Sequence, residues 1–145
     1  LMNPPFAICA LVVTVVVGLS FGCADRTGLE PLPEIDRVEI GELKRVAHSG
    51  QITDSASLIR ARALANDLRS GTWSSLHVVH PACGSVLLTY YAGTKVVGYL
   101  ALEGGFFYTH GHSGQHSRAA NQEKTAEFMA LLPTGFERRK CEARA

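Results

Sequence analysis

The sequence predicts a small α+β domain, in which two helices pack on one face of an antiparallel sheet of about four strands. Two segments, one in the middle of the chain and one near its C-terminus, carry apolar residues at helical spacing. Between them lies a run rich in Val, Leu, Thr and Tyr, broken by short turns that contain Gly. Strands grouped together, rather than alternating with helices, are typical of this class. The expected order is β-α-β-β-β-α.

Residues 37–46 are expected to form the first strand, because apolar Val38 and Ile40 alternate with charged residues. Gly41 interrupts the alternation and predicts a bulge. The following residues 48–50, His-Ser-Gly, predict a turn.

The clearest helix follows Asp54, a residue type that caps helix N-termini. Apolar residues then recur at helical spacing, at Leu58, Ala61, Leu64, Ala65 and Leu68. The opposite face carries most of the charged residues, Arg60, Arg62, Asp67 and Arg69. Gly71 is expected to end the helix, and its alanine-rich stripe favours close packing on a sheet.

The strongest strand signal covers residues 85–91 and 95–102, which are separated by a loop of hairpin length. A second turn leads into a strand at residues 106–109. Residues 73–80 are a candidate for one further strand, which Pro81 would end or confine to a sheet edge. Together these segments predict an antiparallel meander.

The last helix is expected to begin after Asn121 and to run to Leu132, with Pro133 beyond its end. Its expected apolar face comprises Thr125, Phe128, Met129 and Leu132. Both helices would cover one face of the sheet, leaving the other face partly open to solvent or to a partner.

The chain divides into a signal segment at residues 1–23, an extended tether at residues 24–36 and a single domain at residues 37–145. From Leu1 to Ala24 there is no Asp, Glu, Lys or Arg, which is typical of a secretory signal. The apolar run is shorter than the roughly 20 residues that a membrane-spanning helix needs.

The end of this segment, Ser20-Phe21-Gly22-Cys23, resembles the lipobox of bacterial lipoproteins. The family usually has Leu three places before the cysteine, whereas Leu19 stands four places before it here. The resemblance implies that Cys23 becomes the lipidated first residue of the mature chain, anchored to a membrane of the cell envelope. Two alternatives remain open, cleavage after Ala24 with release as a secreted or periplasmic protein, and an uncleaved anchor.

The tether prediction depends on residues 25–34, which lack apolar periodicity. Pro31 and Pro33 block helix formation there, so the segment is expected to be extended. An extended segment would let an anchored domain stand clear of the membrane.

The four cysteines fit an oxidising compartment. Cys9 lies in the signal segment and Cys23 would carry lipid, so that Cys83 and Cys141 remain as a candidate disulfide. This bond would stabilise the domain by roughly 4 kcal/mol in the chain-entropy model. The alternative is a pair of free thiols.

The charge balance argues against a nucleic-acid partner, because the formal net charge is only +1. One basic cluster, Arg138-Arg139-Lys140, is interpreted as a solvated C-terminal tail.

The segment from His110 to Arg118 carries three histidines, His110, His112 and His116, with glycines that let the backbone fold back. These imidazoles predict a possible metal site for zinc or copper. Against it, the segment contains no carboxylate and matches no established zinc spacing. The alternative is a polar surface loop whose histidines titrate in water.

Gly111-His112-Ser113 resembles the nucleophile elbow of α/β-hydrolases, G-x-S-x-G, which places a serine on a turn from a strand to a helix. Gln115 replaces the last glycine, and no histidine follows His116 to complete the catalytic order. The chain is also far shorter than that fold requires.

The sequence thus favours a non-enzymatic envelope protein, exported or lipid-anchored, that acts by binding or by structure without a cofactor. A protein partner would meet the open sheet face or the histidine segment. The alternative function is metal binding through His110, His112 and His116, and ester hydrolysis ranks third.

Overall fold

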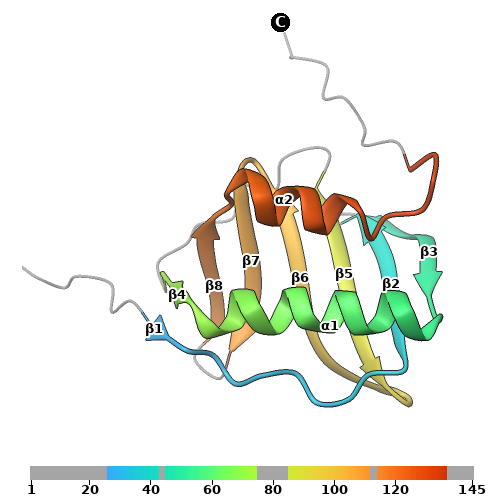
Figure 1. Cartoon of the computed structure of the whole chain (residues 1–145), viewed down its shortest axis with the longest axis horizontal. Helices are drawn as coiled ribbons and strands as arrows, with labels where there is room; N and C mark the ends of the chain where they lie inside the picture. The colour runs from blue at the N-terminus through green and yellow to red at the C-terminus, as the bar shows by residue number, and fades with distance from the viewer. Residues whose placement is uncertain (1–25, 43–44, 75–84, 112–113, 137–145) are drawn as a thin grey trace, which may run out of the picture.

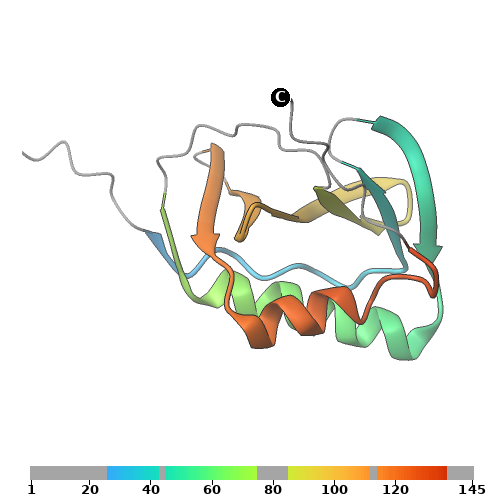
Figure 2. The same cartoon turned by 90° about the horizontal axis from the view of Figure 1, so that it is seen from above.

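The computed structural model describes residues 26–42, 45–74, 85–111 and 114–136. In this part of the chain, two helices cover one face of a six-stranded antiparallel sheet (Figure 1). The view from above shows the helices in one layer and the sheet in another (Figure 2). The predicted α+β class and the placement of both helices on one face are confirmed, although the sheet has more strands than expected.

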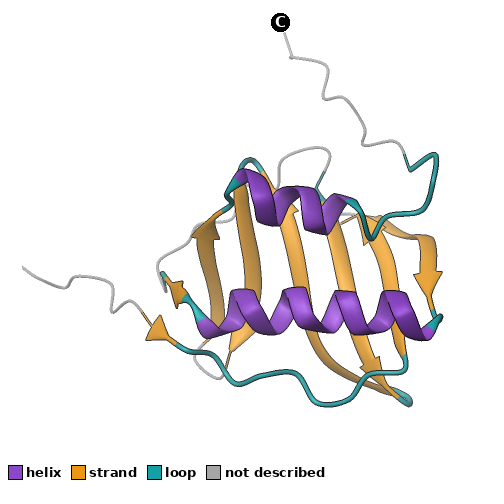
Figure 3. Cartoon of the chain, viewed as in Figure 1, coloured by secondary structure: helices purple, strands orange, loops and turns teal. Residues whose placement is uncertain are grey.

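The strand order in the sheet is β3-β2-β5-β6-β7-β8. The strands are β2 (Arg37–Glu42), β3 (Arg45–Ile52), β5 (Val86–Ala92), β6 (Lys95–Glu103), β7 (Phe106–Gly111) and β8 (Gly114–Ala119). The helices are α1 (Ser55–Ser70) and α2 (Gln122–Met129) (Figure 3). A separate two-stranded sheet pairs β1 (Arg26–Thr27) with β4 (Thr72–Trp73).

Two strands were missed by the sequence analysis because their sequences lack apolar alternation. Strand β3 contains Gly50, which predicted a turn but instead lies opposite Ile40 in the ladder. A side chain there would meet Pro133 Cγ at 3.2 Å, so the close approach of the chain favours glycine. Strand β8 has the polar sequence GQHSRA and pairs with β7 along its whole length. The bulge predicted at Gly41 is confirmed by register shifts on both sides of it.

Strand β4 accounts for the start of the segment predicted as a further strand at residues 73–80. Ser74 then pairs with Ser117 of β8 through two backbone hydrogen bonds of 2.8 and 3.0 Å. The remainder of that segment lies outside the described residues.

The predicted start and end of α1 are confirmed. The Asp54 carboxylate accepts a hydrogen bond of 2.9 Å from the backbone N–H of Ser57, which holds the pKa of Asp54 below its usual value. Gly71 follows the helix and donates its N–H to the carbonyl of Leu68. The buried face comprises Ala61, Leu64, Ala65, Leu68 and also Arg69, which the sequence placed on the charged face.

Helix α2 begins as predicted, because Asn121 Oδ1 accepts a hydrogen bond of 2.8 Å from the N–H of Lys124. It ends at Met129, earlier than the predicted Leu132, and continues as a turn in which Leu132 N–H donates to the Met129 carbonyl. Phe128 is fully buried against Phe107 of β7, with 5.8 Å between the ring centroids.

The core lies between the helices and the facing side of the sheet. Its sheet residues alternate along the strands and include Val38, Ile40, Val86, Leu88, Leu100, Leu102 and Phe107. Tyr90 also faces this layer and donates its hydroxyl to the Ala61 carbonyl at 3.3 Å. Burial raises the pKa of Tyr90 because the phenolate would be cut off from water.

Residues 28–36, which we name the strap, run along α1 without forming a helix or strand (Figure 1). Leu29 and Leu32 are buried in the core. The N–H of Gly28 donates to the Gly71 carbonyl at 3.1 Å, and the N–H of Leu29 to the Arg69 carbonyl at 2.7 Å.

The structure corrects the described part of the predicted tether at residues 24–36, because residues 26–27 pair with β4 and the strap is bonded to the domain and contributes to its core. The sequence analysis placed Arg62 and Arg69 on the charged face of α1 and predicted no contact between that face and the strap. In the structure, Arg62, Asn66 and Arg69 on that face hydrogen-bond to strap residues.

Candidate functional site: a groove between helix α1 and the strap

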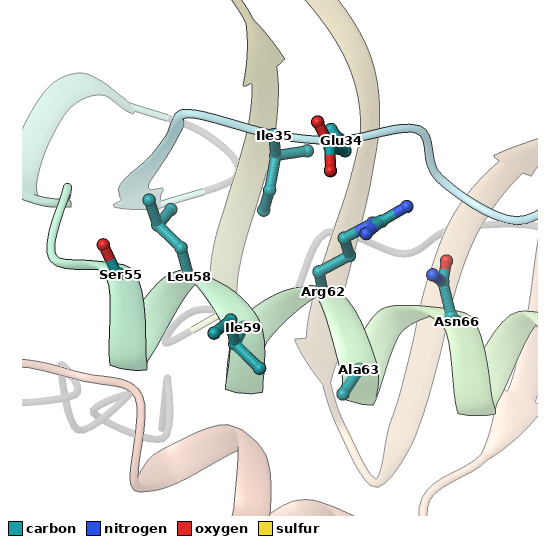
Figure 4. Close-up of a pocket in the computed structure, with 8 residues that line it drawn as sticks. All are labelled: Glu34, Ile35, Ser55, Leu58, Ile59, Arg62, Ala63 and Asn66. Carbon is teal, nitrogen blue, oxygen red and sulfur yellow. The ribbon is translucent and has the colours of Figure 1, made fainter.

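A groove with a volume of about 450 Å³ lies between α1 and the strap (Figure 4). This volume falls within the range of roughly 300–1,000 Å³ that is usual for ligand sites. Its apolar lining comprises Ile35 from the strap and Leu58, Ile59 and Ala63 from α1. The groove therefore depends on the strap for one wall and on successive turns of α1 for the other.

The polar part of the lining is held in place by the strap backbone. Arg62 donates from Nε and Nη2 to the Leu32 carbonyl at 3.3 and 3.2 Å. Asn66 Oδ1 accepts from the N–H of Leu32 at 2.7 Å. These bonds fix two polar side chains one helical turn apart, so a ligand would meet them already ordered.

Ile59 is the most exposed large apolar side chain in the described residues, with 69% of its surface accessible. It lies on α1 beside Ala63, at the side of the groove away from the strap (Figure 4). Leu58 and Ile35 point toward each other across the groove in the same view. Ile59 therefore extends the apolar lining of the groove onto the exposed surface of α1.

The groove lining suits binding better than catalysis. Glu34 is the one carboxylate among the lining residues, so they offer no pair of carboxylates for general acid and base. Ser55 is the one hydroxyl among them, and the described residues that line the groove include no histidine, cysteine or lysine to activate it.

The sheet face away from the helices was predicted to be partly open. Its residues Ala101, Tyr108 and Ser117 are buried, whereas Tyr91 and Tyr99 are half-buried. This face is therefore less accessible than expected in the region of β6, β7 and β8.

The half-buried part of that face is occupied by contacts among its own side chains. The guanidinium carbon of Arg37 lies 4.2 Å from the centroid of the Tyr91 ring. Tyr91 donates its hydroxyl to Glu39 Oε2 at 2.9 Å, and this hydrogen bond raises the pKa of Tyr91. Arg37 Nε also lies 3.4 Å from Glu39 Oε1. We therefore regard the groove, rather than this face, as the better candidate for a binding site.

The structure separates two of the three histidines of the candidate metal site. Strands β7 and β8 form a hairpin in which His110 lies opposite Gln115, and His116 lies opposite Thr109. Directly opposed residues share a sheet face and successive residues alternate, so His110 and His116 point to opposite faces.

The surroundings of the two side chains differ accordingly. His110 is exposed and contacts the Tyr99 ring at 4.6 Å between centroids, whereas His116 is fully buried. They cannot share one ion in this hairpin, and His112 lies outside the described residues. Among the residues that the structure describes, no group of three or more His, Cys, Asp or Glu side chains converges as a metal site would require.

The order of elements around Gly111 also differs from that of a nucleophile elbow, which Gly111-His112-Ser113 resembles in sequence. That motif requires a turn from a strand to a helix. Here β7 is followed by β8, with Gly111 paired to Gly114. Ser113 itself lies outside the described residues.

The predicted lipidation site Cys23 and the predicted disulfide partners Cys83 and Cys141 lie outside the described residues. No helix in the described part of the chain has the length and apolar character needed to cross a membrane.

No protein-family model matches the chain, and comparisons with curated proteins and with solved structures found no match. The sequence analysis missed the groove, although one signal was present. Ile59 interrupts the polar face of α1, where an exposed isoleucine has no role in the core.

Proposed function

We propose that this protein is a non-enzymatic, exported protein of the cell envelope, anchored through lipid on Cys23, that binds a protein partner in the groove beside α1. The observation that supports binding is the combination of an apolar groove with exposed Ile59 and with the ordered polar groups of Arg62 and Asn66. Membrane attachment is supported by the lipobox-like sequence that ends at Cys23.

The lining of the groove favours a segment of a protein chain as its occupant. The facing side chains of Leu58 and Ile35 suit an apolar side chain of the partner, and Ile59 extends the apolar surface outside the groove. Arg62 and Asn66 are bonded to the backbone of Leu32, so the groove already accommodates one extended chain along its edge. Apolar side chains surrounded by a polar rim are usual at protein–protein interfaces.

A photo-crosslinking amino acid placed at Ile59 is expected to give one discrete adduct when the full chain is expressed in cells. Val96 provides a matched control, because it is 49% exposed and also aliphatic but does not line the groove. Denaturing gel electrophoresis and mass spectrometry of the adduct would identify the partner.

Groove specificity is tested by adding Ala63→Arg to the Ile59 crosslinking variant. Ala63 is exposed in the groove, so the longer side chain should fill it with little effect on folding. We expect the adduct to fall by about tenfold, which corresponds to about 1.4 kcal/mol of binding energy. Equal adducts at Ile59 and Val96, or an adduct unaffected by Ala63→Arg, would contradict binding in the groove.

Lipid attachment is tested by growing bacterial cells that express the full chain with a labelled fatty acid. We expect the wild-type protein to take up the label and to partition into detergent, and Cys23→Ala to lose both properties. Cys9→Ala is the matched control, because Cys9 lies in the same apolar segment and should be dispensable for labelling. Label that persists in Cys23→Ala would reject this anchor site.

A further inference from the structure

We propose that the lipid anchor holds the domain against the membrane by the corner where β1 and β4 pair, with the groove directed away from the bilayer. This inference rests on the lipid attachment proposed above. It replaces the expectation of a tether that lets the domain stand clear of the membrane.

The strap is fixed to the domain close to its N-terminal end. Arg26 lies opposite Trp73 and Thr27 opposite Thr72 in the β1–β4 pair. The next residues, Gly28 and Leu29, donate their N–H groups to carbonyls at the C-terminal end of α1.

Side chains of α1 continue this attachment toward the middle of the strap. Arg69 donates from Nε to the Glu30 carbonyl at 2.6 Å, and Arg62 and Asn66 hold both backbone groups of Leu32. Leu32 also packs on β6, where a Cβ at Gly98 would lie 2.5 Å from Leu32 Cδ2. The strap is thus fixed by backbone pairing, buried side chains and polar bonds together.

Only a short length of chain separates the proposed anchor from this attachment. Cys23 stands three residues before Arg26. Because an extended chain spans at most about 3.6 Å per residue, Cys23 must lie within about 11 Å of β1. With residues 24–36 free, Cys23 would be fourteen residues before the first fixed residue, Arg37, which allows about 50 Å by the same measure. The fixed strap therefore shortens the maximum distance between Cys23 and the domain, compared with the tether predicted from the sequence.

The attachment and the groove lie toward different ends of α1. Strands β1 and β4 lie at the C-terminal end of α1, and Ser55 lies at the opposite end of that helix (Figure 1). The helix separates these ends by about 24 Å, at 1.5 Å per residue. The groove is lined by α1 residues from Ser55 to Asn66, so most of it lies toward the end farther from the anchor. A protein partner would reach the groove from the aqueous side.

The experiment uses the full lipidated chain in vesicles that contain a lipid with a spin label on its headgroup, which quenches fluorescence at short range. A fluorescent amino acid is placed at Thr72 in one variant and at Ser55 in another. Both positions are exposed and carry small hydroxyl side chains, so they form a matched pair. We expect quenching at Thr72 and no quenching at Ser55.

A third variant carries a Gly/Ser insertion of about 12 residues between Asp25 and Arg26, which adds a mean reach of about 20 Å without altering the domain. We expect this insertion to remove the quenching at Thr72. Equal quenching at Thr72 and Ser55, or quenching at Thr72 that survives the insertion, would overturn the proposed orientation. If Cys23 carried no lipid, the protein would not bind the vesicles at all. That result differs from both outcomes that would overturn the orientation.

Discussion

Replacing Trp73 with Ala is expected to lower the free energy of unfolding by about 3–5 kcal/mol, the usual cost of removing a large buried aromatic side chain. Trp73 is fully buried where β1, β4 and the end of α1 meet. Its indole Nε1 donates to the Leu68 carbonyl at 2.8 Å, and the guanidinium carbon of Arg118 lies 5.6 Å from its ring centroid. Urea unfolding followed by circular dichroism would measure the change.

The control for this prediction is Trp73→Phe, which keeps most of the apolar volume and removes the indole donor. We expect a cost of about 1 kcal/mol from the lost hydrogen bond, with a further smaller cost from the unfilled volume. The Leu68 carbonyl still accepts from Arg118 Nη1 at 2.8 Å, so it does not lose all of its donors. If Trp73→Ala cost no more than Trp73→Phe, the packing of the indole would not stabilise this corner.

Arg69→Ala is expected to destabilise the protein by about 3 kcal/mol, because bonds from a charged group to buried acceptors are among the stronger ones. Arg69 donates to the Glu30 carbonyl at 2.6 Å and from Nη1 to Thr109 Oγ1 at 3.0 Å. It thus joins the strap to α1 and β7. Burial lowers the pKa of this guanidinium, although arginine stays charged in proteins.

Hydrogen exchange at the Leu29 amide separates a local effect of Arg69→Ala from a global one. We expect Arg69→Ala to speed exchange at the Leu29 amide more than in the core strands. The variant removes the bond from Arg69 to the strap, on which the pairing of the sheet strands does not depend. Arg60→Ala is the matched control on the same helix, because Arg60 is exposed and bonds only to Ser57 among the described residues. Arg60→Ala should change the free energy of unfolding by no more than about 0.5 kcal/mol. Equal costs for the two variants would contradict the role assigned to Arg69.

These two residues connect stability with the proposed function. Trp73 and Arg69 both hold the corner at which the strap joins the domain. The strap forms one wall of the groove and also limits the distance between Cys23 and the domain. Loosening this corner should therefore alter the groove and, under the proposed lipid attachment, the orientation of the domain toward the membrane.

The sequence was sufficient for features that depend on neighbouring residues. The caps at Asp54 and Asn121 and the hairpin of β5 and β6 were predicted correctly, because each depends on bonds between residues close in the chain. The α+β class followed from the order of these elements. Export stays a prediction, which rests on the continuous apolar run before Cys23.

Contacts between segments far apart in the sequence determined the features that the sequence analysis missed. Strand β8 is polar, and its place at the sheet edge depends on pairing with β7 rather than on its own pattern. That pairing buries His116 and leaves His110 exposed, which separates two residues that the sequence grouped together.

By itself, then, the sequence determined the fold class, the main local elements and the expectation of export. Only the tertiary structure decided that residues 28–36 are fixed along α1 and that a groove lies beside them. The physical reason is that polar side chains such as Arg62, Asn66 and Arg69 can hydrogen-bond either to water or to backbone groups of a distant segment. The sequence pattern of a polar helix face is the same in both cases. Only the folded structure shows whether backbone carbonyl and N–H groups of another segment lie against that face.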